Sequence, residues 1–256
     1  MEGFEILILA AIFLVAVLYS SVGHGGGSGY LAVMAFFAVA PTISRPTALA
    51  LNIFVSGIAA IQFYRRGYFD WKVFLPFAIG SIPLAFIGGW INLPVAYYKY
   101  LLGFVLLFAA FRLAWRFKSV EQPNEGRADN NNLDSDVSLP IWLALLIGGL
   151  IGITSGLIGV GGGIFLTPIL LLTGWSATRH AAGISAAFVM VNSVAGLTGN
   201  DQNAANLPKG VLIWISVAII GGIIGSTLGS KYFNTIVLRR VLASVLLIAG
   251  AKLLLT

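Results

Sequence analysis

The chain has 256 residues, of which 58% are hydrophobic and 9% charged, whereas a typical soluble domain carries about 25% charged residues. This composition excludes an ordinary soluble domain and indicates an integral membrane protein with helical spans. The net charge of +6 comes from scattered Lys and Arg residues, which does not indicate nucleic-acid binding, and the absence of Cys excludes disulfides and thiolate metal sites.

Apolar segments occur in two groups of five, separated by a polar stretch. That stretch, residues 118–138, holds five of the nine carboxylates and three consecutive Asn residues, a composition that cannot bury enough apolar surface to order itself. We therefore predict a first transmembrane repeat over residues 1–117, a polar linker over 118–138 and a second transmembrane repeat over 139–256. The apolar segments lie near residues 4–22, 28–44, 46–63, 71–90 and 95–117, and near 140–158, 164–178, 180–199, 208–229 and 236–255.

The two groups align at an offset of about 134–137 residues, which pairs Arg45 with Arg179 and Gly88 with Gly225. We assign the two glycines of the second pair to helix packing. The second segment of each group is short, and it either crosses upright or forms a re-entrant hairpin with the first. Both versions place the halves in opposite orientations. The predicted fold is an all-α polytopic membrane protein with two inverted repeats of five apolar segments and 8 to 10 transmembrane helices.

The distribution of Lys and Arg predicts the orientation of the chain in the membrane. Most of these residues fall on the cytoplasmic side if both termini lie outside, and positive residues favour that side. The linker is then cytoplasmic as well, although it is acidic, because Asp and Glu contribute little to orientation.

Each group contains a Gly-rich break at the corresponding place. Four glycines in five residues destabilise a helix, and unpaired backbone at membrane depth is tolerated where protein buries it or where it lines a watery cavity. We therefore predict that the breaks contact substrate, with the alternative that the glycines only let helices pack closely. The glycines concerned are Gly23, Gly25, Gly26 and Gly27 in the first break, and Gly159, Gly161, Gly162 and Gly163 in the second.

The charge of the expected substrate follows from the carboxylates, none of which lies in the middle of a predicted span. Cation transporters usually keep Asp or Glu at membrane depth, whereas an anion can be held by backbone N–H groups at a helix N-terminus. Ser28 follows the first break and belongs to this candidate site. Asn52, Ser185 and Asn192, in the third segments, are candidates to complete it and equally to form hydrogen bonds between helices.

Three basic residues are further candidates. His24 lies inside the first break, where it can donate to an oxyanion or carry a coupling proton, or pair with a neighbouring carbonyl. Arg45 and Arg179 are predicted to steer and gate the anion at the outer and inner mouths, since guanidinium binds oxyanions well. The alternative for both is interfacial anchoring.

Enzyme motifs are not supported. The string His24-Gly25-Gly26-Gly27 matches the HGGG of esterase oxyanion holes, but the chain contains no G-x-S-x-G elbow. Neither break fits a nucleotide-binding loop. We expect no catalytic residue, no cofactor and no metal site.

The paired Gly-x-Gly-Gly-Gly breaks, each followed by a short segment and then by a small-residue third segment such as 181–185, resemble the sulfite exporter TauE/SafE family, also called the 4-toluene sulfonate uptake permeases. The resemblance covers nearly the whole chain, and His24 departs from the more usual apolar residue. It implies a secondary transporter in the bacterial inner membrane that moves a small anion, sulfite or an organosulfur oxyanion, by alternating access. The alternatives are an anion channel and a membrane scaffold that transports nothing. The sequence does not indicate an oligomeric state.

Overall fold

The computed structural model describes residues 2–21, 25–114, 140–200, 207–208, 210–229 and 235–255, and these form α-helices and their connections without a β-strand. The predicted all-α fold is confirmed for this part of the chain. The helices are α1 (Glu2–Ser21), α2 (Gly27–Phe36), α3 (Pro41–Arg65), α4 (Trp71–Trp90), α5 (Val95–Ala114), α6 (Ile141–Ile158), α7 (Gly163–Leu172), α8 (Thr178–Gly199), α10 (Val211–Gly229) and α11 (Thr235–Leu255).

Among the described residues, five helices are long and apolar enough to cross a membrane, namely α3, α4, α5, α6 and α8. The helices that follow the breaks differ from them. With 10 residues each, α2 and α7 are about 15 Å long, half of a hydrocarbon core of about 30 Å. They are shorter than the predicted segments 28–44 and 164–178.

The early end of α2 has a local cause. Ala38 adopts a φ of 55°, which an L-residue rarely takes inside a helix, and Pro41 then starts α3 at a position where its missing N–H costs no hydrogen bond. The third segment, predicted near 46–63, therefore begins five residues earlier, and Pro46 lies inside the helix.

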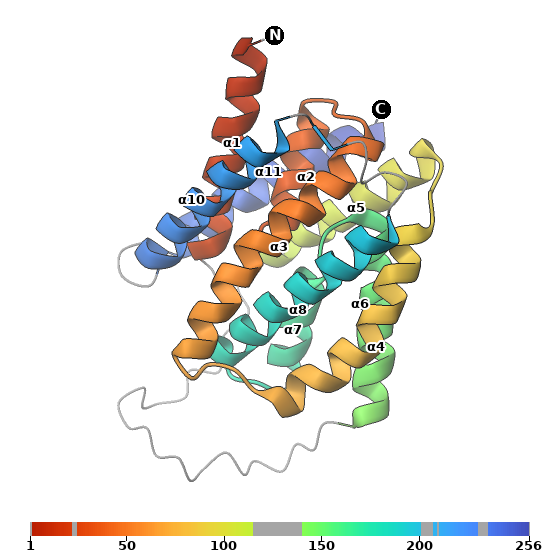
Figure 1. The fold of residues 1–256 in the computed structure, drawn as a ribbon, viewed down its shortest axis with the longest axis vertical. Helices are drawn as coiled ribbons and strands as arrows, with labels where there is room; N and C mark the ends of the chain where they lie inside the picture. Colours follow the sequence, from red (N-terminus) through yellow and green to blue (C-terminus); the bar gives the residue numbers. More distant parts are fainter. Residues whose placement is uncertain are drawn as a thin grey trace.

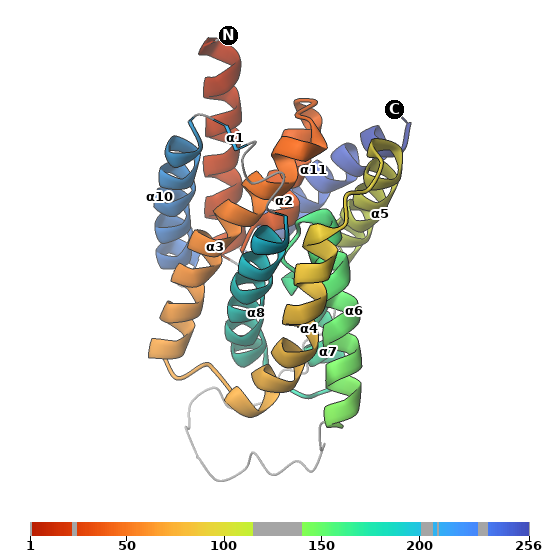
Figure 2. The same ribbon diagram turned by 45° about the vertical axis from the view of Figure 1, so that its right-hand side comes forward.

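The two halves run in opposite directions through the molecule. In Figures 1 and 2, α1 and α3 begin at the upper end, whereas α6 and α8 begin at the lower end. The pair α1 and α2 therefore leaves the upper end and returns to it, and the pair α6 and α7 does the same at the lower end. The described chain ends, at α1 and α11, both lie at the upper end.

The closest helix pairs join one half of the sequence to the other. Helix α4 packs along α6, and α1 packs along α10. A Cβ atom on Gly152 or Gly156 of α6 would collide with the carbonyl oxygens of Ser81 or Ala85 of α4. These pairs therefore touch backbone to backbone. The predicted packing role of Gly88 and Gly225 is confirmed, because a Cβ on either would collide with a carbonyl oxygen of α6 or α1, respectively.

The described hydrophobic core has two parts. One is formed mainly by α1, α2, α5, α10 and α11, and the other by α4, α6, α7 and α8. Helix α3 contributes Leu51 and Val55 to the first part and Ala59 and Ala60 to the second. Gly25 and Gly161 of the two breaks lie beside Asn52, near the middle of α3.

Candidate functional site

The first break connects α1 to α2. Gly26 is the residue before α2 and has a φ of 88°, a conformation that costs an L-residue with a Cβ about 1–2 kcal/mol. A Cβ on Gly26 would also lie 2.8 Å from Cζ of Tyr30, a fully buried ring. The predicted site residues Gly23 and His24 lie outside the described residues.

The second break connects α6 to α7, and more of its described positions than in the first break have the positive φ that favours glycine. Gly159, Gly161 and Gly162 have φ values of 91°, 86° and 85°. The N–H of Gly159 closes α6 by donating to Ser155 O over 2.8 Å. Because three positions in four residues require the left-handed region, substitution of this segment by other residues would straighten or disorder the break.

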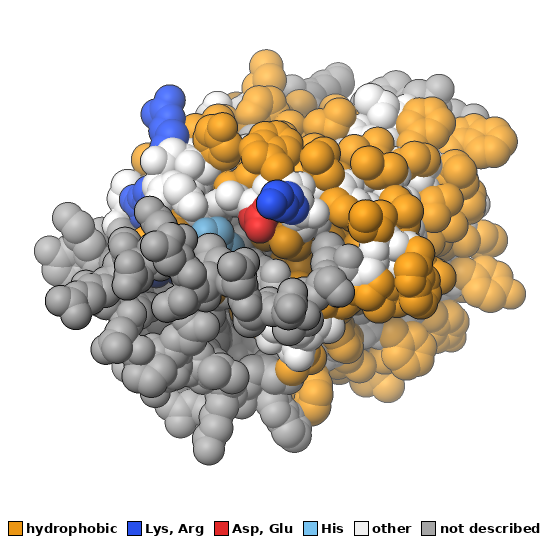
Figure 3. Space-filling model, turned by 90° about the horizontal axis from the view of Figure 1, so that it is seen from below, with side chains coloured by type: hydrophobic (Ala, Val, Ile, Leu, Met, Phe, Trp, Pro, Cys, Tyr) orange, Lys and Arg blue, Asp and Glu red, His pale blue; other side chains and the backbone are white. Residues whose placement is uncertain are grey.

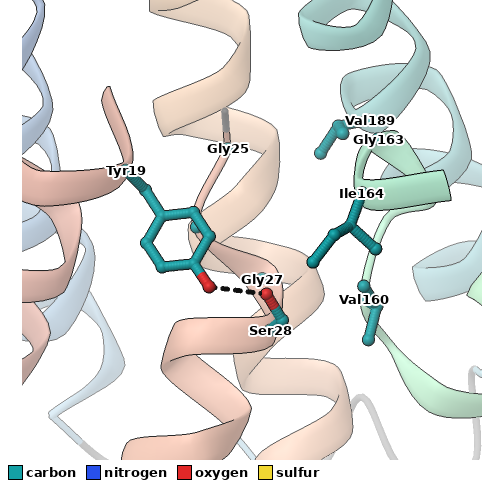
Figure 4. A pocket seen from close by; sticks show the side chains of 9 residues that line it. Tyr19, Gly25, Gly27, Ser28, Val160, Gly163, Ile164 and Val189 are labelled. Carbon is teal, nitrogen blue, oxygen red and sulfur yellow. Dashed lines mark hydrogen bonds between the residues drawn. The ribbon is translucent and has the colours of Figure 1, made fainter. Parts of the chain in front are cut away.

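The two breaks meet around one small cavity, shown in Figure 4. Its volume is about 20 Å³, which is room for a water molecule. Tyr19 Oη and Ser28 Oγ, 2.8 Å apart, lie on the side of α2, and apolar side chains lie on the side of α7 and α8. The lining residues are Tyr19, Gly25, Gly26, Gly27, Ser28, Val160, Gly163, Ile164 and Val189.

The first turns of both short helices border this cavity, with Gly27 and Ser28 from α2 and Gly163 and Ile164 from α7. First-turn N–H groups have no acceptor within their own helix, and the dipole places about half a positive charge at each N-terminus. Neither Gly26 nor Gly162 supplies a side-chain cap. The cavity therefore lies at two positive helix ends.

Two side chains from the long central helices touch both breaks. Asn52 of α3 donates from Nδ2 to the carbonyl oxygen of Val160 over 3.3 Å. Val189 of α8 lies so close that a Cβ on Gly25 or Gly161 would come within 2.9 or 2.7 Å of its Cγ1. The prediction named Asn52 and missed Val189, which has no polar atom to signal it. The one sequence feature that could have identified Val189 is its alignment with Asn52 when the two halves are compared at an offset of 137 residues.

Buried oxygen atoms near the breaks lack a partner. Asn52 Oδ1, Ser193 Oγ and Tyr30 Oη have no hydrogen bond within the part of the chain that the structure describes. A Cβ on Gly161 would lie 3.1 Å from Ser193 Oγ, so this hydroxyl adjoins the second break. Buried polar atoms almost always have a partner, which indicates that a water molecule or a ligand completes this region.

The other predicted polar residues link helices. Ser185 Oγ accepts a hydrogen bond of 2.8 Å from Thr167 Oγ1 of α7. Asn192 accepts from Ser81 of α4 at Oδ1 and donates from Nδ2 to Phe188 O over 2.9 Å. Neither Ser185 nor Asn192 is among the residues that line the cavity. Both residues thus form hydrogen bonds between helices in this structure, and their part in a substrate site stays a prediction.

Arg45 is buried near the start of α3, with 4% of its surface exposed. Its Nε donates to Gly156 O and its Nη1 to Ile91 O, both over 3.0 Å, and its Nη2 donates to Gly88 O and Gly89 O, both over 2.6 Å. These carbonyls belong to the last turns of α4 and α6 and to Ile91, the residue that follows α4, and the helix dipole favours a positive charge there. In this conformation the guanidinium ties three helices together at the upper end, and its bonds go to the backbone.

Arg179 lies at the opposite end, where α8 begins, and is exposed. Its Nη1 donates to Tyr68 Oη over 2.8 Å, and its guanidinium carbon lies 5.4 Å from the centre of that ring. The His180 ring meets the same tyrosine edge-on at 5.7 Å. Figure 3, which views the molecule from below, displays charged and His side chains near one another among hydrophobic ones. The matched arginines thus differ: Arg45 is buried and Arg179 is accessible.

The sequence matches the model of the family described as Sulfite exporter TauE/SafE over residues 8–253. The chain belongs to the TauE/SafE family. A Sinorhizobium fredii protein named "Probable membrane transporter protein" is 35% identical over 244 residues, covering 95% of this chain and 96% of the relative. Proteins of the same description from Bacillus subtilis and Methanocaldococcus jannaschii are each 26% identical and cover 97% and 98% of this chain and 98% of their own length.

No solved structure matches this TauE/SafE protein. The family and the names of the relatives identify a multi-pass membrane protein of a transporter family. The suspected resemblance is thereby confirmed.

Proposed function

We propose that this TauE/SafE protein is a secondary transporter that moves a small anion, sulfite or an organosulfur oxyanion, by alternating access. One observation carries the proposal: the N-termini of two half-length helices meet at a single cavity between the breaks. Half-helix N-termini that meet at the middle of a membrane are a recurrent way to hold an anionic group in transporters.

The charges of the surrounding helices support an anion over a cation. Helices α2 to α8 contain no Asp or Glu, so a cation in the cavity would lack a compensating charge. Peptide N–H groups of α2 and α7 supply donors on the cavity wall, and so does one hydroxyl of the Tyr19–Ser28 pair, since the other hydroxyl donates its proton within the pair. We assign sulfite or an organosulfur oxyanion from the description of the family.

The neighbourhoods of the two breaks support inverted repeats. A Cβ on Gly25 would meet Val189, Ser56 and Asn52, and a Cβ on Gly161 would meet Val189, Asn52 and Ser193. When the two halves are aligned at an offset of 137 residues, Asn52 pairs with Val189 and Ser56 pairs with Ser193. The opposite directions of α1 and α6, and of α3 and α8, agree with this relation. We place the pseudo-two-fold axis between Asn52 and Val189.

The same packing suggests which helices move together. Helix α4 contacts α6, and α10 contacts α1, backbone to backbone. Each moving unit therefore consists of three helices from one half of the sequence and one helix from the other half. We assign α1, α2, α3 and α10 to one unit and α4, α6, α7 and α8 to the other. The cavity lies between them and must widen as the units move apart to admit an anion, because in this structure it has room only for a water molecule. Arg45 connects the two units at the upper end.

The positive residues also favour one orientation. Arg65 and Arg66 lie at the end of α3, which is at the lower end of the molecule in Figure 2, and cytoplasmic loops are rich in such residues. We propose that the lower end faces the cytoplasm of a bacterial cell, with both termini outside the inner membrane and the linker inside.

An exchange assay in liposomes tests the function. Protein reconstituted with unlabelled sulfite or methanesulfonate inside should accumulate the labelled anion from outside, and empty liposomes should not. Ionic conductance without exchange would indicate an anion channel, and neither exchange nor conductance would indicate a membrane scaffold. Either result would contradict the proposed carrier.

A further inference from the structure

Val189 contacts both breaks through its two methyl groups. Cβ atoms on Gly25 and Gly161 would lie 2.9 and 2.7 Å from its Cγ1, and a Cβ on Gly163 would lie 2.5 Å from its Cγ2. The side chain is 4% exposed and lines the cavity. In Figure 4 it lies above Gly163 and Ile164, on the side away from Tyr19 and Ser28.

The cavity walls therefore differ in chemistry. Tyr19 and Ser28 place hydroxyl groups on one side, whereas Val160, Ile164 and Val189 are apolar. An anion whose oxygens face the N–H groups and hydroxyls must direct its remaining substituent toward apolar surface. Val160 and Ile164 belong to the second break and its short helix, whereas Val189 belongs to the long helix α8.

We propose that Val189 determines which anions the transporter accepts, by limiting the size of the substituent opposite the charged group. This inference rests on the proposed anion transport and goes beyond it by naming the residue that selects among anions. At the matching position of the other half stands Asn52, whose amide holds the Val160 carbonyl. The two central positions thus divide their roles: Asn52 positions the second break, and Val189 sets the space beside it.

The test compares exchange of methanesulfonate, ethanesulfonate and propanesulfonate by the parent protein and by Val189→Ala. The variant should raise the efficiency for propanesulfonate relative to methanesulfonate by about tenfold or more, since one methylene in an apolar pocket typically changes selectivity roughly 10–200-fold. Val189→Leu should shift the ranking in the opposite direction. Val191→Ala is the matched control, because Val191 lies on the same helix but lines an apolar groove between α4 and α8. It should keep the parent ranking.

A second measurement uses the absence of native Cys. Val189→Cys should react with a small anionic thiol reagent such as 2-sulfonatoethyl methanethiosulfonate, and a transported anion at about ten times its dissociation constant should slow the reaction about tenfold. The reaction of Val191→Cys should not respond to the anion.

The outcomes separate the two claims. If the parent exchanges the anions and Val189→Ala keeps the parent ranking, the role of Val189 is overturned and the transport function stands. If the parent exchanges none of the anions and none of them protects Val189→Cys, the transport function and the inference built on it both fail.

Discussion

Replacement of Arg45 by Lys should destabilise the protein strongly. The guanidinium distributes four hydrogen bonds over Nε, Nη1 and Nη2, and these reach carbonyls of two different helices. A Lys ammonium is a single point that can serve the Gly88 and Gly89 carbonyls together, but it cannot reproduce the planar fork. The carbonyls of Ile91 and Gly156 would then lose their donors.

The magnitude follows from those two bonds. A hydrogen bond to a charged group contributes about 1.5–3 kcal/mol, so the loss of two predicts a destabilisation of about 3–6 kcal/mol, reduced where water reaches the freed carbonyls. Arg179→Lys is the matched control. It alters an exposed residue, for which substitutions usually stay within about 0.5 kcal/mol.

Thermal unfolding of the purified proteins in detergent measures the difference. A chain of this size loses about 2–4 °C in unfolding temperature per kcal/mol, so Arg45→Lys should unfold at least about 6 °C below the parent. Arg179→Lys should unfold at the same temperature as the parent. An Arg45→Lys protein as stable as the parent would refute the structural role of the buried arginine. Both variants are still expected to lose transport, because each removes a guanidinium from one end of the pathway.

Three further predictions concern the breaks, the packing and the topology. Gly162→Ala should abolish anion binding measured by ligand-induced thermal stabilisation, because a Cβ there adds crowding to a positive φ; Gly174→Ala has the same φ problem in open space and should bind like the parent. Gly225→Ala should lower stability by about 1–3 kcal/mol, the usual cost of overpacking, and keep binding once folded; loss of binding by the folded variant would contradict its packing role. Single Cys residues at positions 130 and 203, both outside the described residues, should label from opposite sides of the membrane, and labelling from one side would exclude inverted repeats.

The sequence predicted the backbone features that depend on local chemistry. The density of glycine located both helix breaks, and α2 and α7 begin at Gly27 and Gly163, each one residue before the predicted segment. Apolar segment lengths predicted an all-helical membrane protein. The start of α3 was misplaced: the third apolar segment was predicted near 46–63, whereas α3 begins at Pro41 and includes Pro46.

The features that the sequence did not predict depend on contacts between distant segments. The partners of Arg45 were not predicted, because they are backbone carbonyls 43 to 111 residues away and a carbonyl gives no signal in sequence; its role in steering the anion stays a prediction. Val189 was missed because an apolar residue in an apolar helix does not stand out. Its importance comes from the close approach of Gly25 and Gly161, which only the packing of α8 against both breaks creates.

The central claim is that an anion binds between the two breaks. Selenite is a close chemical analogue of sulfite whose selenium can be located by anomalous scattering in a crystal of the protein. The account predicts one selenium site between Gly27 and Gly163, with its oxygens within hydrogen-bonding distance of first-turn N–H groups of both α2 and α7. Selenium found only elsewhere, with the space between the breaks empty in a crystal of the saturated protein, would contradict the account.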